Sequence, residues 1–126
     1  MYREYQPNAK ANKKHACDCV VRAICATTGK SWQETYDLLC AKGRKLQCMP
    51  NAKPTWKAVL RDLGFVSHSI KVIRGCKRPT ASTLTEEHKG RMIVQTAHHL
   101  VGCKNGDVYD SWNSSDTPAY SYWVLE

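Results

Sequence analysis

The sequence HLVGCKNGDVYDSW (residues 99–112) gives the strongest indication of the fold, a tight turn between two short strands. Asn105-Gly106 is typical of a two-residue hairpin turn, because both residue types accept the positive φ that this turn requires. A two-residue loop places Lys104 opposite Asp107 and fixes the register of the pairs beyond them. We therefore predict a β-hairpin formed by residues 100–103 and 108–112.

This register determines which polar side chains share a face of the hairpin. His99 lies opposite Trp112, so His99 and Asp110 are diagonal neighbours on the same side. We expect the carboxylate of Asp110 to orient the imidazole of His99. His98 points to the other face, opposite Asn113, and these two residues form the alternative pair.

The sequence DCVVRAICATTG (18–29) predicts a helix that carries a cysteine in its first turn. Asp18 is a favourable N-cap residue, and Gly29 is a favourable stop. Cys19 would then lie where unpaired N–H groups and the helix dipole lower the pKa of a thiol. Cys17 lies before the helix and lacks this help. A cysteine, a histidine and a carboxylate are the parts of an activated nucleophile, so we predict this role for Cys19, with a buried structural cysteine as the alternative.

The remaining sequence predicts further helices followed by strands. A capping box at Ser31 and Glu34 begins a second helix, which we expect to end at Gly43, and a basic loop should follow over 44–53. Pro54 begins a third helix that ends before Gly64. Further elements are expected as a strand from Phe65 with Val66, Ile70 and Val72 on one side, a short helix over 84–89, and strands over 92–96 and 119–125. Helices first and an antiparallel sheet second indicate the α+β class.

A length of 126 residues suits one domain, which we place at 15–126, preceded by a loosely packed basic arm at 1–14. No apolar run is long enough to span a membrane, and the N-terminus lacks the apolar segment of a secretory signal. The seven cysteines are an odd number without a disulfide-like spacing. We therefore expect a soluble protein with reduced thiols, located in the cytoplasm.

The net charge of +8 is concentrated at Arg3–Lys14, Lys42–Lys57 and Lys71–Arg78. Such a surface would attract nucleic acid, proteins bound to nucleic acid, or acidic partners. A solvated basic surface that keeps a small protein soluble is the alternative, and no nucleic-acid-binding motif argues against it. We expect these basic segments to select a partner rather than to perform chemistry.

The segment His15-x-Cys17-x-Cys19 contains the ligand types of a zinc site. The single-residue gaps are tighter than usual for zinc, and no second paired cluster follows. We therefore predict neither a metal site nor another cofactor.

These motifs together resemble the papain-like cysteine peptidase superfamily. His99-Leu100-Val101 resembles the His-Ala-Val of that family, and Asp110-Ser111-Trp112 resembles its Asn-Ser-Trp. The stretch 18–32 is also similar to small peptidase-like proteins of bacteria and their phages, which implies a host cytoplasm as the location if a phage encodes the chain. The resemblance implies a minimal papain-like fold, a Cys19, His99 and Asp110 triad, and a protein or peptide substrate. It also implies that Trp112 shields the orienting residue.

The chain departs from the family pattern before the nucleophile. Members carry a glutamine several residues upstream, whose amide completes the oxyanion hole with the cysteine N–H. Here no glutamine lies between Gln6 and Cys19, so Asn12 and His15 are the candidates. The chain is also too short for two substrate-binding lobes, which disfavours broad endopeptidase activity. The function expected is a cysteine-dependent hydrolase or acyl-transferase; the alternative is a non-catalytic basic binding or inhibitor protein.

Overall fold

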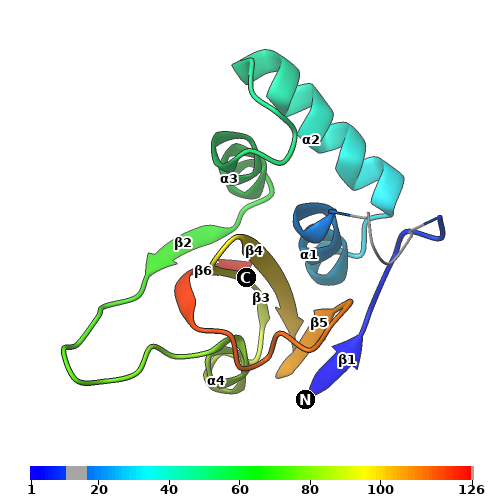
Figure 1. The fold of residues 1–126 in the computed structure, drawn as a ribbon. Coiled ribbons are helices and arrows are strands. Elements are labelled where there is room, and N and C mark those ends of the chain that lie inside the picture. The colour runs from blue at the N-terminus through cyan, green and yellow to red at the C-terminus, as the bar shows by residue number, and fades with distance from the viewer. Residues whose placement is uncertain (11–16, 126) are drawn as a thin grey trace.

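The computed structural model describes residues 1–10 and 17–125, which fold as an α+β protein (Figure 1). Within these residues there are four helices and a six-stranded sheet, so the predicted α+β class is confirmed. The elements in chain order are β1 (Tyr2–Glu4), α1 (Cys19–Thr28), α2 (Trp32–Leu46), α3 (Lys53–Asp62), β2 (Val66–Ser69), α4 (Ala81–Glu87), β3 (Arg91–Thr96), β4 (His99–Lys104), β5 (Asp107–Asp110) and β6 (Ala119–Leu125).

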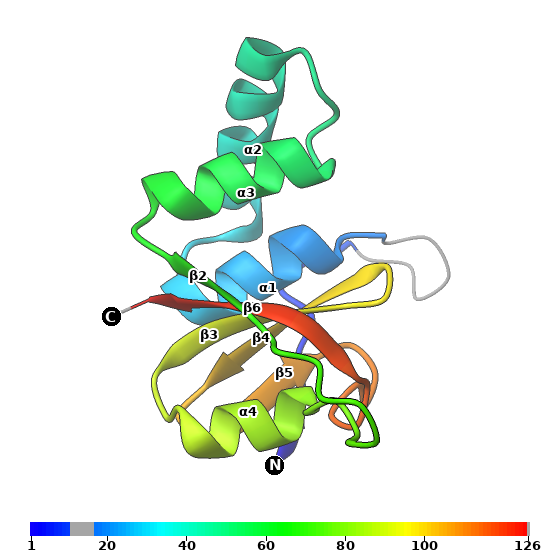
Figure 2. The same cartoon turned by 90° about the vertical axis from the view of Figure 1, so that its left-hand side faces the viewer.

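The sheet lies between two unequal layers of helices. Its strand order is β1-β5-β4-β3-β6-β2, with α1, α2 and α3 on one side and α4 on the other (Figure 2). One apolar cluster, which includes Ile24, Leu60 and Trp123, fills the space between the larger helical layer and the sheet. A second cluster, which includes Leu84 and Val101, lies between α4 and the opposite face. Burial on both faces explains why the central strands are almost continuously apolar.

The hairpin of β4 and β5 has the predicted register. Asn105 and Gly106 have φ values of 54° and 86°, as the two-residue turn requires. Lys104 pairs with Asp107, and Gly102 pairs with Tyr109. The hairpin therefore places the start of β4 beside the end of β5.

The first five residues do not form the loose arm that we expected. β1 pairs in parallel with β5, so the sheet is mixed rather than purely antiparallel. The N–H of Tyr5 donates to the carbonyl of Asp110 at 2.7 Å, and Arg3 forms an ion pair of 2.7 Å with Asp107. The physical reason is that β5 would otherwise be an edge strand with unpaired backbone groups. Residues 11–14 of the expected arm lie outside the described residues.

Helix α2 continues past Gly43, where we expected it to end, and the following loop is correspondingly shorter. A Cβ at Gly43 would lie 2.6 Å from the carbonyl oxygen of Cys48, so this glycine permits a close approach of the loop rather than a stop. The helix ends instead at Gln47, which takes a left-handed conformation with φ 56°.

Helix α4 begins earlier than predicted, because the hydroxyl of Thr80 accepts a hydrogen bond from the N–H of Thr83.

The predicted strand from Phe65 is shorter than its alternating pattern indicated. β2 pairs only with β6, at the edge of the sheet, and all four of its residues are exposed. His68, which we expected to be packed, is exposed and stacks on Tyr122 with 5.0 Å between ring centroids. Val72 lies beyond the strand and is 60% exposed. An alternating pattern predicts that one face of a strand packs on other elements. At this edge of the sheet both faces of β2 are exposed.

Helix α1 packs closely on β4 at a glycine. A Cβ at Gly102 would lie 2.9 Å from the Cβ of Ala26 and 3.2 Å from the Cα of Ala23. The small residues let the helix approach the strand, and this contact sets the position of the helix N-terminus relative to the start of β4.

Candidate active site

Cys19 is the first residue of α1 and is half-buried beside the start of β4. Burial raises the pKa of its thiol, but hydrogen bonds from the His99 ring and from the N–H of Leu100 lower it. The positive charges of His99 and Arg22 lower it further, so that the pKa lies below its ordinary value. These contacts stabilise the thiolate of Cys19 relative to that of an ordinary cysteine.

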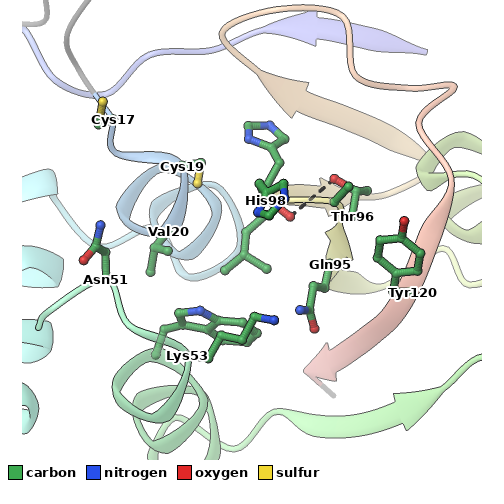
Figure 3. A pocket seen from close by; sticks show the side chains of 13 residues that line it. Cys17, Cys19, Val20, Asn51, Lys53, Gln95, Thr96, His98 and Tyr120 are labelled. Carbon is green, nitrogen blue, oxygen red and sulfur yellow. Dashed lines mark hydrogen bonds between the residues drawn. The ribbon is translucent and has the colours of Figure 1, made fainter. Parts of the chain in front are cut away.

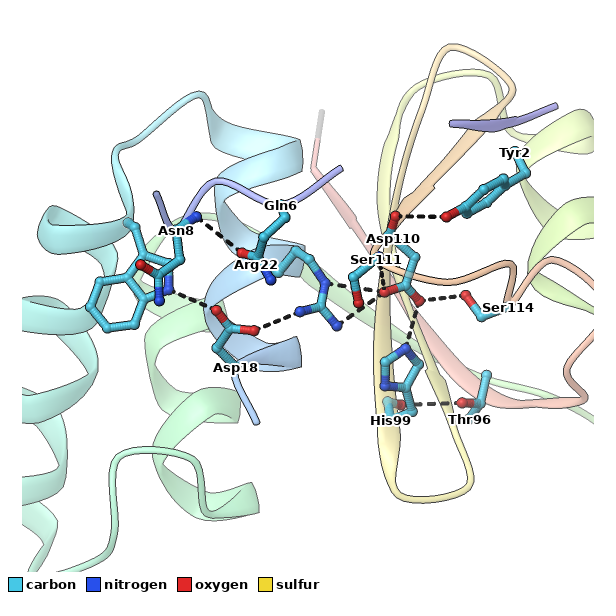
Figure 4. Close-up of polar contacts among 11 residues, drawn as sticks. Tyr2, Gln6, Asn8, Asp18, Arg22, Thr96, His99, Asp110, Ser111 and Ser114 are labelled. Carbon is cyan, nitrogen blue, oxygen red and sulfur yellow. Dashed lines mark hydrogen bonds and ion pairs between the residues drawn. The ribbon is translucent and has the colours of Figure 1, made fainter. Parts of the chain in front are cut away.

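His99 begins β4 and faces both Cys19 and Asp110. Its Nε2 lies 2.6 Å from Oδ2 of Asp110 (Figure 4). Burial lowers the pKa of the imidazole, but the hydrogen bonds and negative charges of Asp110 and Cys19 raise it to about 9. A pKa of about 9 keeps His99 mostly protonated at neutral pH, and the charge of the imidazolium stabilises the Cys19 thiolate relative to the neutral thiol.

Asp110 ends β5, and its side chain is only 1% exposed. Oδ2 accepts hydrogen bonds from His99 and from the hydroxyl of Ser114 at 2.5 Å. Oδ1 accepts from the N–H of Ser111 at 2.7 Å and from Arg22. Burial raises the pKa of this carboxyl, but the bonds from His99, Ser114 and Ser111 outweigh it, and the pKa is lowered. Asp110 is thus a fully bonded carboxylate behind the imidazole.

A pocket of about 420 Å³ opens beside Cys19 and His99 (Figure 3). It lies between the N-terminal ends of α1 and α3, the β3–β4 turn and β6. Its other lining residues are Cys17, Val20, Asn51, Lys53, Trp56, Gln95, Thr96, Ala97, His98, Leu100 and Tyr120. A second hollow of about 320 Å³ adjoins it at Cys17, Val20 and Asn51 and has mainly apolar walls. The sulfur of Cys19 is therefore reachable by a ligand larger than water.

The predicted contact between His99 and Asp110 is confirmed, and the alternative pair does not form in the described part of the chain. His98 is exposed in the β3–β4 turn with φ 55°. Asn113 is exposed, and its Oδ1 accepts from the N–H of Ser115 at 3.2 Å. The geometry of the β3–β4 turn directs His99 inward, toward Asp110, and leaves His98 exposed at the rim of the pocket.

Two supporting residues behave differently from expectation. The side chain of Asp18 does not cap α1, because its oxygens are bonded to Arg22 at 2.6 Å and to the indole N–H of Trp32 at 3.0 Å. Trp112 is 50% exposed, and its ring centroid lies 5.1 Å from that of His99. The tryptophan thus covers the imidazole, whereas Asp110 is buried by its own hydrogen-bond partners.

Arg22 was not singled out in the sequence, although it is 5% exposed within the site. Its guanidinium contacts both Asp18 and Asp110. The available signal was its place on the buried side of a predicted helix, four residues after Asp18, where ion pairs form. Recognition of its second partner required the tertiary fold.

The oxyanion candidates Asn12 and His15 lie outside the described residues. The backbone N–H of Cys19 belongs to the first turn of α1, where helix geometry leaves such donors without an intrahelical acceptor. Across residues 1–10 and 17–125 no group of three His, Cys, Asp or Glu side chains could hold a metal ion.

No helix among the described residues has the length and apolar character needed to cross a membrane. Comparisons with protein-family models, curated proteins and solved structures find no match to this chain.

Proposed function

We propose that this protein is a cysteine-dependent hydrolase or acyl-transferase that acts on an amide or isopeptide bond of a protein or peptide. The observation that carries the proposal is that Cys19 and His99 line the same open pocket, that His99 lowers the pKa of the Cys19 thiol, and that its ring is bonded to Asp110. The resemblance of 99–101 and 110–112 to papain-like peptidase motifs supports the same reading.

The arrangement suits nucleophilic catalysis by a thiolate. The sulfur of Cys19 attacks the substrate carbonyl carbon, and the N–H of Cys19 can donate to the developing oxyanion. The His99 imidazolium then gives its proton to the leaving amine, and a thioester remains on Cys19. Neutral His99 next takes a proton from water or an acceptor amine, which attacks the thioester. The carbon–sulfur bond of the thioester then breaks, and the acid or new amide leaves. Cys19 is again a thiolate, and His99 keeps the proton that it took from the attacking group.

The proposal is tested by mapping thiol reactivity with iodoacetamide at pH 7. We expect Cys19 to be alkylated fastest, because its thiolate is stabilised and the pocket admits the reagent. Cys17→Ala is a matched control, since Cys17 lines the same pocket but lies outside the helix. Cys19→Ala should abolish fast labelling and the turnover of a peptide library, with an unchanged circular dichroism spectrum. Loss of both signals in Cys17→Ala instead would assign the nucleophile to Cys17.

A non-catalytic binding role is the second candidate, and one exposed loop favours it. Val72 and Ile73 are 60% and 59% exposed and are flanked by Lys71 and Arg74. Basic and apolar groups exposed together are typical of a binding surface. In that case Cys19 should react no faster than Cys17, and binding to an acidic partner or nucleic acid should survive Cys19→Ala.

A further inference from the structure

Arg22 lies at the centre of a buried ionic network behind the candidate active site. Its Nη1 lies 2.6 Å from Oδ1 of Asp18. Its Nη2 and Nε lie 3.0 and 3.1 Å from Oδ1 of Asp110. Figure 4 shows the guanidinium between the two carboxylates, with His99 on the far side of Asp110. Along this line the charges of Asp18, Arg22, Asp110 and His99 can alternate in sign.

The burial of this network calls for an explanation other than stability. The side chains of Asp18, Arg22 and Asp110 are 3%, 6% and 1% exposed. Desolvation of such charges is costly, and well-packed apolar residues often replace a buried ion pair without loss of stability. Cys25 and Ala26, which follow Arg22 by three and four residues on the same face of α1, are buried and apolar. An apolar residue at position 22 would therefore suit the packing, but it would leave Asp110 short of a partner.

The bonds to Asp110 are divided between its two oxygens. Arg22 and the N–H of Ser111 take Oδ1, whereas His99 and Ser114 take Oδ2. Rotation of the carboxylate would break the two bonds from Arg22, so the guanidinium keeps Oδ2 directed at the imidazole. Its positive charge also favours the ionised carboxylate over the neutral acid.

Arg22 also joins the elements that carry the three candidate catalytic residues. It lies three residues after Cys19 on α1 and contacts Asp110 at the end of β5. Asp18 extends the connection to α2, because its second oxygen accepts from Trp32. The distance between the thiol and the imidazole thus depends on a helix that is tied to the strand behind the histidine.

We propose that Arg22 is a positioning residue that keeps the carboxylate of Asp110 directed at His99, and thereby maintains the reactive pair of His99 and Cys19. This inference rests on the proposed function. It assigns a chemical reason to an arginine that is buried next to apolar residues of α1.

The test compares Arg22→Gln and Arg22→Lys with wild type in the pH dependence of Cys19 alkylation by iodoacetamide. We expect Arg22→Gln to move the midpoint upward by about one pH unit, which corresponds to about tenfold slower alkylation at pH values below both midpoints. Arg22→Lys keeps the charge but not the two-pronged geometry, so its shift should have the same sign and be smaller. Because lysine retains the charge, this variant keeps the test decisive if the glutamine variant does not fold.

A double-mutant comparison with Asp110→Asn separates positioning from general stability. If Arg22 acts through Asp110, the shift caused by Arg22→Lys should largely disappear in the Asp110→Asn background. Thermal melting monitored by circular dichroism reports stability independently. Folded Arg22 variants with the wild-type midpoint would overturn the inference, as would equal shifts in both backgrounds. Failure of the proposed function is a different result, namely that wild-type Cys19 itself shows no enhanced reactivity.

Discussion

The half-buried thiol of Cys19 derives its reactivity from neighbours rather than from exposure. Burial alone would raise its pKa, and the imidazole of His99 supplies the largest opposing effect. His99 in turn depends on Asp110, because burial lowers the imidazole pKa and the carboxylate restores and raises it. At the scale of single residues, each ionised group therefore requires the next one.

Replacement of His99 should shift the pH dependence of Cys19 reactivity. In wild type we expect the midpoint of alkylation to lie below the ordinary thiol pKa of 9.0, because the Cys19 pKa is lowered. In His99→Gln the desolvation effect remains without the imidazolium, so the midpoint should rise toward 9 or above. Stopped-flow alkylation over pH 5–10 measures this shift, and His98→Gln is the matched control. An equal shift in both variants would contradict the assignment.

Turnover should also decline on the alkaline side. Protonated His99 gives its proton to the leaving amine, and its pKa is raised to about 9 by Asp110 and Cys19 against the effect of burial. The imidazolium is therefore complete at neutral pH and is lost as pH rises through about 9. We expect kcat for a peptide substrate to fall over this range, while alkylation of Cys19, which needs only the thiolate, remains high.

At the scale of elements, the site depends on how closely α1 lies on β4. Helix α1 carries Cys19 at its start, and β4 carries His99 at its start. Gly102 is the point of closest approach, opposite Ala23 and Ala26. The hairpin turn at 105–106 then brings Asp110 to the other side of His99.

Gly102→Ala should therefore loosen both the fold and the site. The added Cβ would meet Ala26 at 2.9 Å, and we expect the overpacking to cost about 1–3 kcal/mol of unfolding free energy. Since the helix must move away from the strand, Cys19 alkylation at neutral pH should also slow. Gly90→Ala is the control, because nothing lies within 4 Å of a Cβ there. Urea unfolding measures the first effect, and wild-type stability for Gly102→Ala would contradict this packing account.

At the scale of the whole molecule, two apolar layers enclose the sheet while the basic segments remain at the surface. The connection between β2 and α4 is exposed and carries Lys71, Arg74 and Lys77. The buried carboxylates instead lie at one end of the sheet, within the ionic network of Arg22. Lys53 of the segment Lys42–Lys57 lines the pocket beside Cys19, whereas Lys71, Arg74 and Lys77 are not among the residues that line it.

Neutralisation of the surface charge should affect binding and leave the thiol unchanged. We expect Lys71→Gln, Arg74→Gln and Lys77→Gln together to weaken binding to an acidic partner or an oligonucleotide and to flatten its salt dependence. Cys19 reactivity should stay near wild type, because charges beyond about 8–10 Å are largely screened. Lys89→Gln with Lys104→Gln is a control outside these segments. Parallel loss of binding and of reactivity would place the loop within the active site.

Stability toward acid should depend on Asp110. Burial raises the pKa of this carboxyl, but its hydrogen bonds lower it below the ordinary 3.8, so its contribution is present above that value. The contribution is lost as pH falls through the lower folded-state pKa. The difference in unfolding free energy between wild type and Asp110→Asn should therefore be largest above about pH 4 and shrink in more acidic solution. Urea titrations at several pH values measure it, and a difference independent of pH would contradict the assignment.

Local sequence patterns determined much of the framework. The Asn105-Gly106 turn fixed the hairpin register, and that register placed His99 and Asp110 on one face. The capping box at Ser31 and Glu34 began α2 as predicted. Such features depend on neighbours in the chain, so a sequence is sufficient to predict them.

Contacts between distant residues were decided only by the tertiary structure. No local pattern predicts the pairing of β1 with β5 or the contact of Arg22 with Asp110. The same holds for the close approach of Gly43 to the carbonyl of Cys48, where α2 continues instead of ending. Asp18 occupies the N-cap position of α1, yet its carboxylate accepts hydrogen bonds from Arg22 and Trp32 instead of capping the helix. The physical reason is that a buried charge takes whichever partner the packed fold brings to it, and that partner outweighs the local preference.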